Sequence, residues 1–192
     1  MKKFIHITLL LSAFLSPLMA DKLIFTEFGA AYSSVIMPRA LENNTTGVYD
    51  MPAIEAKAGV NILKWADVYA GTGFQMFMDR QNEQQYYTFY PVYGGIRANI
   101  FSEWIVFPSI IFEYGAAFAN RHTQYVINPI QMGDRDNTWW SSYYNFGLGI
   151  NWNLTDVSVI SLKIERPAYS NLNVSYGELQ AFKAGLAFKI FY

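Results

Sequence analysis

Hydrophobic and polar residues alternate along most of this 192-residue chain. The last segment shows the alternation most clearly: from Phe182 to Tyr192 every second residue is apolar, while Lys183, Gly185 and Lys189 lie between them. A period of two is the pattern of a β-strand with two different faces. The same pattern predicts eight strands, at residues 23–37, 53–64, 68–78, 86–100, 104–119, 139–153, 157–165 and 182–192.

The connections between these predicted strands alternate in length. Short turns are expected near residues 65, 102 and 155, and longer loops at 38–52, 79–85, 120–138 and 166–177. Short turns on one rim and longer loops on the other are typical of an outer-membrane barrel, with the long loops outside the cell. We therefore predict an all-β fold, a single eight-stranded antiparallel up-and-down transmembrane β-barrel.

The aromatic residues bear on which face of the barrel meets lipid. A soluble barrel of the lipocalin kind hides its apolar face inside, so alternation alone leaves both classes open. All five tryptophans fall at predicted strand ends, as do Tyr143 and the terminal Tyr192, and aromatic rings at both bilayer interfaces are typical of membrane barrels. The predicted aromatic girdle comprises Trp65, Trp104, Trp152 and Tyr192 near the short turns, and Trp139 and Trp140 near a long loop.

The charged residues of the strands also favour a membrane barrel, because they alternate with the apolar positions. A cation facing lipid near the bilayer midplane costs about 2–4 kcal/mol, so these side chains are expected inside. An eight-stranded barrel is just wide enough for side chains to fill it, which predicts paired charges in a filled interior and leaves an ion or proton path as the alternative. The predicted interior charge set is Glu27, Glu55, Lys57, Arg97, Glu113, Lys163, Glu165, Lys183 and Lys189.

The two ends of the chain and its composition agree with export. A basic start, an apolar run from Phe4 to Leu15 and a small residue at Ala20 predict a signal peptide at 1–20 and a barrel domain at 21–192. Cleavage would leave 12 basic and 15 acidic residues, a net charge of −3, which does not suit nucleic-acid binding. The chain has no cysteine, so a disulfide framework and a cysteine-ligated metal site are excluded. No cofactor is expected.

The signal peptide, the alternation, the unequal loops and the terminal aromatic strand together resemble the small eight-stranded outer-membrane proteins of the OmpA-barrel and OmpX type. The resemblance covers nearly the whole chain and implies no particular activity. The last strand also resembles the C-terminal signal by which such barrels are recognised for assembly. It implies the barrel-assembly machinery and outer-membrane lipid, including lipopolysaccharide, as partners.

Candidate chemistry is concentrated near the longest predicted loop. His122 opens that loop, Asp134 and Asp136 lie in it, and Ser141 and Ser142 follow it, so a Ser/His/Asp set for acyl transfer on lipid is one hypothesis. Solvated loop residues are the alternative. Residues 168–171 (Ala-Tyr-Ser-Asn) are similar to the His-Tyr-Ser-Asn segment of lipid A 3-O-deacylases. Ala168 replaces the catalytic histidine of that family, so only Ser170 carries over.

A further motif lies in the first long loop. Residues 42–46 (Glu-Asn-Asn-Thr-Thr) match an acidic-extended glycosylation pattern centred on Asn44, although a chance match is the commoner explanation of so short a pattern.

The sequence leaves three functions open. The first is a non-enzymatic outer-membrane barrel, structural or adhesin-like, whose surface loops meet a host or phage ligand. The second is a lipid A-modifying barrel enzyme of the deacylase or acyltransferase kind, and the third is a narrow channel.

Overall fold

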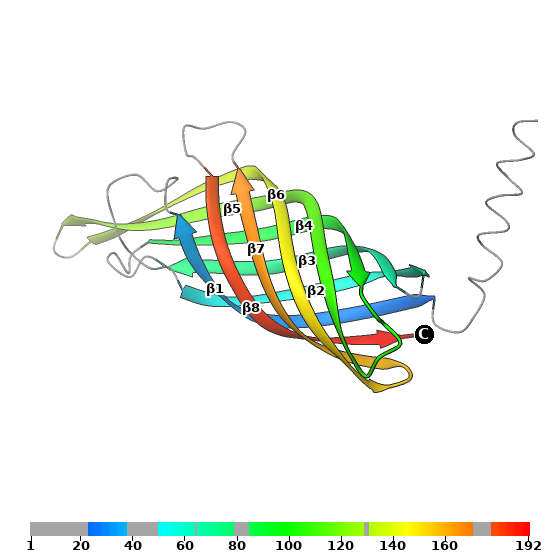
Figure 1. The fold of residues 1–192 in the computed structure, drawn as a ribbon. Coiled ribbons are helices and arrows are strands. Elements are labelled where there is room, and N and C mark those ends of the chain that lie inside the picture. The colour runs from blue at the N-terminus through cyan, green and yellow to red at the C-terminus, as the bar shows by residue number, and fades with distance from the viewer. Residues whose placement is uncertain (1–22, 38–49, 64, 79–84, 129–130, 171–177) are drawn as a thin grey trace, which may run out of the picture.

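The computed structural model describes residues 23–37, 50–63, 65–78, 85–128, 131–170 and 178–192. These residues form eight antiparallel strands that close into one barrel, which confirms the predicted fold class (Figure 1). The predicted signal peptide at 1–20 and Asn44 lie outside the described residues. The strands are β1 (Ile24–Met37), β2 (Asp50–Leu63), β3 (Ala66–Met78), β4 (Gln85–Asn99), β5 (Val106–Asn128), β6 (Gln131–Thr155), β7 (Ser158–Ser170) and β8 (Glu178–Phe191).

Each strand pairs with its neighbours in sequence, and the barrel closes where β8 pairs with β1. Glu27 lies opposite Lys189 in this last pair, and Phe28 lies opposite Phe188. Because side chains alternate across a strand, the register gives every strand the same parity: odd-numbered residues point inward and even-numbered residues point outward. The alternation read from the sequence is therefore the division between the interior and the outer wall.

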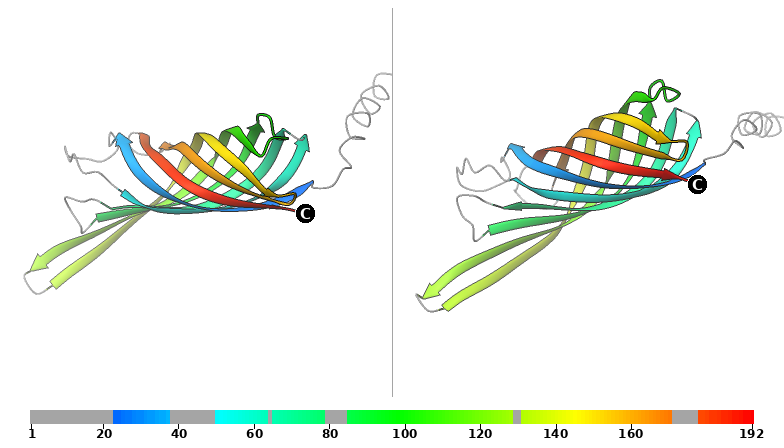
Figure 2. Two further views of the ribbon diagram at one scale, coloured as in Figure 1. Left: turned by 60° about the horizontal axis from the view of Figure 1, so that its bottom comes forward. Right: turned by 90° about the horizontal axis from the view of Figure 1, so that it is seen from below.

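The two rims differ as expected. The connections near residues 65, 100–105 and 156–157 gather at the end where the C-terminus lies, which we call the turn rim (Figure 1). Phe101 adopts a φ of 57° in one of these turns, and its ring stacks on that of Trp104 at 4.7 Å between centroids. The opposite end, from which β5 and β6 project, is the loop rim (Figure 2).

The structure corrects two of the predicted loops. Residues 120–138 were expected to form the longest loop, but β5 and β6 continue as a paired hairpin as far as Asn128 and Gln131. Figure 2 shows this hairpin extending well beyond the other strands. The expected loop at 166–177 begins only after Ser170, where β7 ends. Polar residues outside a bilayer need no apolar face, so the hairpin strands lack the alternation on which the prediction relied.

Candidate functional site

The charged residues of the strands meet inside the barrel. Their side chains come from six of the eight strands, and each of these residues except Glu55 is buried, with Glu55 partly buried. Asp67 joins them from the start of β3 and is fully buried. The predicted third strand begins at residue 68 and so omits Asp67, although its odd number assigns it to the interior. The interior charge cluster comprises Glu27, Glu55, Lys57, Asp67, Arg97, Glu113, Lys163, Glu165, Lys183 and Lys189.

Glu27 forms the centre of one half of this cluster. The guanidinium of Arg97 donates to both of its carboxylate oxygens, at 2.6 and 2.9 Å. Lys163 also donates to Glu27 and reaches Glu55 at 2.6 Å. A two-pronged arginine–carboxylate contact is among the strongest charged hydrogen bonds, so this pair fixes β1 against β4 across the barrel.

Glu113 is the centre of the other half. Lys57 donates to it at 2.6 Å and Asn145 at 2.8 Å. The hydroxyls of Tyr69 and Tyr143 donate at 2.9 and 3.1 Å. Four donors from three different strands thus satisfy one fully buried carboxylate, which is what a buried charge requires if it is not to destabilise the fold.

The remaining basic residues complete the cluster. Lys183 bridges Glu55 at 2.8 Å and Glu165 at 2.6 Å. Lys189 donates to Asp67 at 2.5 Å, and its ammonium lies over the rings of Phe25 and Phe191 at 4.0 and 4.6 Å from their centroids. The cluster thus pairs five acidic with five basic side chains and carries no net charge.

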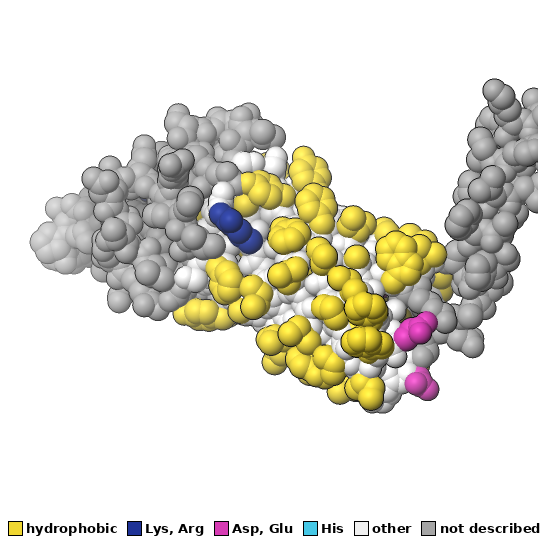
Figure 3. Space-filling model, viewed as in Figure 1, with side chains coloured by type: hydrophobic (Ala, Val, Ile, Leu, Met, Phe, Trp, Pro, Cys, Tyr) yellow, Lys and Arg dark blue, Asp and Glu magenta, His cyan; other side chains and the backbone are white. Residues whose placement is uncertain are grey.

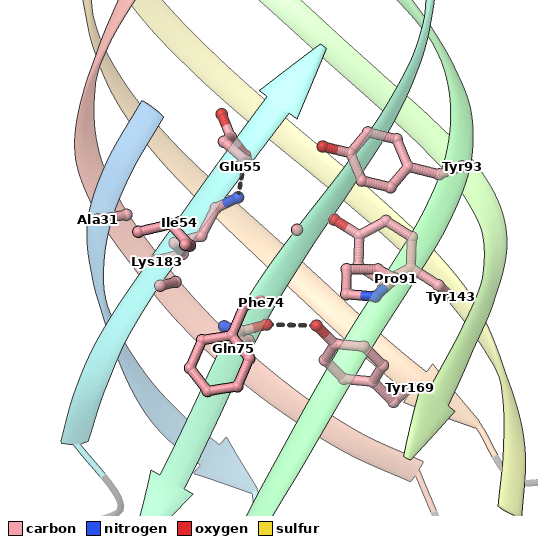
Figure 4. Close-up of a pocket in the computed structure, with 12 residues that line it drawn as sticks. Ala31, Ile54, Glu55, Phe74, Gln75, Pro91, Tyr93, Tyr143, Tyr169 and Lys183 are labelled. Carbon is pink, nitrogen blue, oxygen red and sulfur yellow. Dashed lines mark hydrogen bonds and ion pairs between the residues drawn. The ribbon is translucent and has the colours of Figure 1, made fainter. Parts of the chain in front are cut away.

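Toward the loop rim the interior is filled by aromatic side chains. The rings of Tyr93 and Tyr143 lie 5.1 Å apart, those of Tyr143 and Tyr169 lie 5.3 Å apart, and the Tyr169 hydroxyl donates to Gln75. Figure 4 shows these rings facing Lys183 and its partner Glu55 from across the barrel. The cavity between them measures only about 20 Å³, so side chains of the described residues fill the cross-section at this level.

The outer wall is apolar between the two rims. Figure 3 shows hydrophobic side chains spread over one face of it, with a basic group toward the loop rim and acidic groups toward the turn rim. On β8 the outward positions from Phe182 to Tyr192 span 11 residues, which matches the length of a transmembrane β-strand. Exposure of large apolar side chains on this scale destabilises a protein in water and suits a wall that faces lipid.

Five of the six expected girdle residues lie on the outer wall or a turn, and one does not. Trp65, Trp104, Trp140 and Tyr192 are exposed, with Trp140 at 64%. Trp152 is partly buried and occupies an outward-facing position of β6. Trp139, in contrast, has inward parity and packs against the buried aromatic cluster, so its assignment to the girdle is corrected. Tyr143, expected near the same rim, is buried inside for the same reason.

The candidate catalytic residues come together only in part. His122 and Asp136 lie opposite each other on β5 and β6, with 2.6 Å between Nδ1 and Oδ1, and the His122 ring stacks on Tyr86. Asp134 lies two residues farther toward the hairpin tip, opposite Gln124. Ser141 points inward and donates to the backbone oxygen of Ser170 at 3.0 Å.

The serines on the outward face are distant from the His122–Asp136 pair. Ser142 and Ser170 are paired across β6 and β7. Ser142 is six residues along β6 from Asp136, or about 20 Å at strand spacing. The described residues therefore place no serine beside His122.

The described part of the chain offers no cluster of three or more His, Cys, Asp or Glu side chains arranged to hold a metal ion. It also contains no helix that is long and apolar enough to cross a membrane. The candidate chemistry is thus limited to the interior charge cluster, the His122–Asp136 pair and the two rims.

Comparison with known proteins rests on structure. No protein-family model matches the sequence, and a search of curated proteins gave no match. Among solved structures, Neisserial surface protein A superposes with a TM-score of 0.65 at 8% identity, covering 88% of this chain and 97% of that one. The fold is that of a small outer-membrane β-barrel. The attachment invasion locus protein Ail of Yersinia pestis superposes with a TM-score of 0.51 at 11% identity, covering 89% of this chain and 100% of that one.

A second structure of Ail, in complex with the heparin analogue sucrose octasulfate, gives the same TM-score at 14% identity. These identities are low, so the similarity concerns the barrel itself. It agrees with the resemblance drawn from the signal peptide, the alternation and the terminal strand.

Proposed function

We propose that this chain is an outer-membrane surface protein that acts in attachment, and that it is not an enzyme. The proposed orientation places the turn rim in the periplasm and the loop rim outside the cell, as in other barrels with short periplasmic turns. The names of the two similar proteins, a surface protein and an attachment protein, support the proposal.

The observation that carries the proposal is the projecting β5–β6 hairpin above a filled barrel. Pairing between β4 and β5 ends at Gln85 and Thr123, and pairing between β6 and β7 ends at Ser142 and Ser170. Beyond these points the described residues of the hairpin pair only with each other, so two strand edges have no strand partner in the part of the chain that the structure describes. An exposed edge can add an extended segment of another protein through main-chain hydrogen bonds.

The test is to remove the hairpin and keep the barrel. Replacing residues 123–135 by a two-residue turn retains the cross-strand pair of His122 with Asp136. Bacteria expressing the full chain should attach to cultured epithelial cells and to immobilised heparin more strongly than cells carrying the empty vector, and the shortened variant should not. Heat-modifiable gel mobility reports whether the variant barrel has folded. Equal attachment by full chain and vector would overturn the proposal.

A second candidate is a lipid-modifying enzyme, which the His122–Asp136 pair favours because a carboxylate orients a histidine base in this way. The 20 Å separation of Ser142 from Asp136 argues against it. Mass spectrometry of lipid A from cells with the full chain and with H122A separates the two functions. If the full chain changes the acyl pattern of lipid A and the H122A variant does not, the result would favour the enzyme and contradict the proposed role in attachment.

The narrow channel is the least supported function, because the interior is filled at the level of Tyr143 and Lys183. Measurement in planar bilayers tests it, and regular single-channel steps from the purified chain would favour transport over attachment.

A further inference from the structure

Arg166 of β7 places a cation on the outer wall of the barrel. Its even number gives it outward parity, and its side chain is exposed. Every member of the interior charge cluster has an odd number, so among the described residues Arg166 is the one charged side chain on the apolar part of the outer wall. An outward cation is costly at the bilayer midplane and tolerated near an interface, so the depth of Arg166 bears on its role.

Arg166 lies at the loop-rim end of the apolar wall. From Ser158, where β7 begins at the turn rim, to Arg166 is nine residues, the length of a transmembrane strand. Glu165 pairs with Lys183 of β8, which places Arg166 beside Phe182, where the outward residues that span the bilayer on β8 begin. Both strands thus put Arg166 at one membrane interface, which is that of the outer leaflet in the proposed orientation.

The side chain of Arg166 extends toward the loop rim. Its guanidinium donates to the side-chain oxygen of Gln180, which pairs in register with Ala168, one outward position farther toward that rim. Ala168 faces outward and yet is only 2% exposed, so larger side chains cover it. An arginine at an interface keeps its stem on apolar surface and its charged head among polar groups in this way. Among the described side chains Gln180 is its one acceptor, so most of the guanidinium N–H groups face outward for an acceptor in the membrane.

The surroundings of Arg166 have a polar side and an apolar side. Toward the loop rim, Ser142 of β6 and Ser170 of β7 form an outward pair. Toward the turn rim, the next outward pair of the same strands is apolar and exposed, formed by Leu148 and Ile164. Hydroxyls, a cation and hydrocarbon thus follow one another down the wall. The polar head, the phosphate and the acyl chains of an anionic lipid follow one another in the same order.

We propose that the outer wall around Arg166 binds lipopolysaccharide, with a phosphate of lipid A accepting from the guanidinium. A guanidinium binds a phosphate through two parallel N–H groups. The sugars lie toward Ser142 and Ser170, and the acyl chains pack on the wall near Ile164. Lipopolysaccharide is the phosphate-bearing lipid of the outer leaflet, and its several acyl chains suit a wall that is apolar on both sides of β7. The site rests on the orientation given under the proposed function, but it does not involve the hairpin.

The ligand side is tested with the full chain in phosphatidylcholine nanodiscs, where native mass spectrometry counts the lipids that stay bound. The probes are lipid A with both phosphates, lipid A without phosphate, and phosphatidylglycerol. Bisphosphorylated lipid A should bind, and each of the other two should bind at least tenfold more weakly. Equal binding of dephosphorylated lipid A would exclude the phosphate contact, and equal binding of phosphatidylglycerol would make the site one for any anionic lipid; either result would overturn the proposal. No cell takes part, so the result is independent of attachment.

The protein side is tested by removing and moving single charges. Arg166→Gln should weaken the binding of bisphosphorylated lipid A at least tenfold. Glu178→Gln, on β8 near the same rim, removes a negative charge and should not weaken it. Val92→Arg on the exposed wall of β4, in the R166Q background, returns a cation elsewhere and should not restore binding.

Unchanged binding by a folded R166Q barrel, its restoration by V92R, or an equal loss in E178Q would contradict the assignment. If R166Q does not fold, as heat-modifiable gel mobility would report, the comparison of lipid A with and without phosphate on the unchanged chain still decides.

Discussion

The carboxylate of Glu113 should contribute most to stability, because four donors converge on it. Replacing it by glutamine keeps the shape but removes the charge that compensates Lys57, and turns one acceptor oxygen into an NH₂ group that faces donors. Breaking a buried ion pair from one side costs about 3–5 kcal/mol. In the variant, the ammonium of Lys57 still has two carboxylates nearby, those of Glu55 at 3.3 Å and Glu165 at 3.9 Å. The free energy of unfolding of E113Q should therefore fall by about 3 kcal/mol, the lower end of this range.

The double variant separates the ion pair from simple loss of packing. Lys57→Met alone leaves Glu113 with three neutral donors and an uncompensated charge, so it too should cost about 3–5 kcal/mol. With both charges removed, the loss of unfolding free energy should be smaller than the sum of the single losses by about 0.5–3 kcal/mol, the range of coupling between residues in one network. The assay is reversible urea unfolding in lipid vesicles, followed by tryptophan fluorescence and by heat-modifiable gel mobility.

The neighbouring residue supplies the control. Tyr114 lies on the outer wall and is 61% exposed, so Tyr114→Phe should change the free energy of unfolding by no more than about 0.5 kcal/mol. An E113Q barrel as stable as Y114F, or single losses that simply add in the double variant, would refute the reasoning that the buried cluster is stabilised by mutual pairing.

Three further experiments test other parts of the structure. In vesicles of brominated lipid, Trp140→Phe should lower the fraction of tryptophan emission that the lipid quenches and Trp139→Phe should not, because of these two only Trp140 faces lipid; the reverse result would return Trp139 to the girdle. A Cβ at Gly71 would lie 2.6 Å from the Tyr93 ring, whereas at Gly94 its nearest contact would be 3.9 Å away. Gly71→Val should thus cost about 1–3 kcal/mol by overpacking, and Gly94→Val should be tolerated; equal losses would contradict the packing. Leu186→Arg, on the outer wall of β8, should cost about 2–4 kcal/mol in a bilayer, and no loss would place that wall away from lipid.

The sequence predicted the strands and the interior charges for one physical reason. A strand in a bilayer must keep one face apolar, so Lys163 and Glu165 could only share the face opposite Ile164. Closure of the barrel then brought together charges far apart in sequence, such as Lys57 and Glu113. The odd number of Asp67 assigns it to the interior as well, but the predicted third strand begins one residue after it.

Other features could not be obtained in this way. Tyr143 and Trp139 are aromatic residues near a strand end, and composition does not distinguish a ring at the interface from one that fills the interior. The extension of β5 and β6 depends on pairing between polar strands, such as His122 with Asp136, which carries no apolar period.

The central claim is that odd-numbered side chains fill the barrel and even-numbered side chains face lipid. Because the chain has no cysteine, a single nitroxide label can be placed in turn at each position from 143 to 150 of β6, and its collision rate with oxygen measured in vesicles by electron paramagnetic resonance. The structure requires high oxygen accessibility at positions 144, 146, 148 and 150 and low accessibility at the four odd positions. Uniform accessibility, or the opposite alternation, would contradict it.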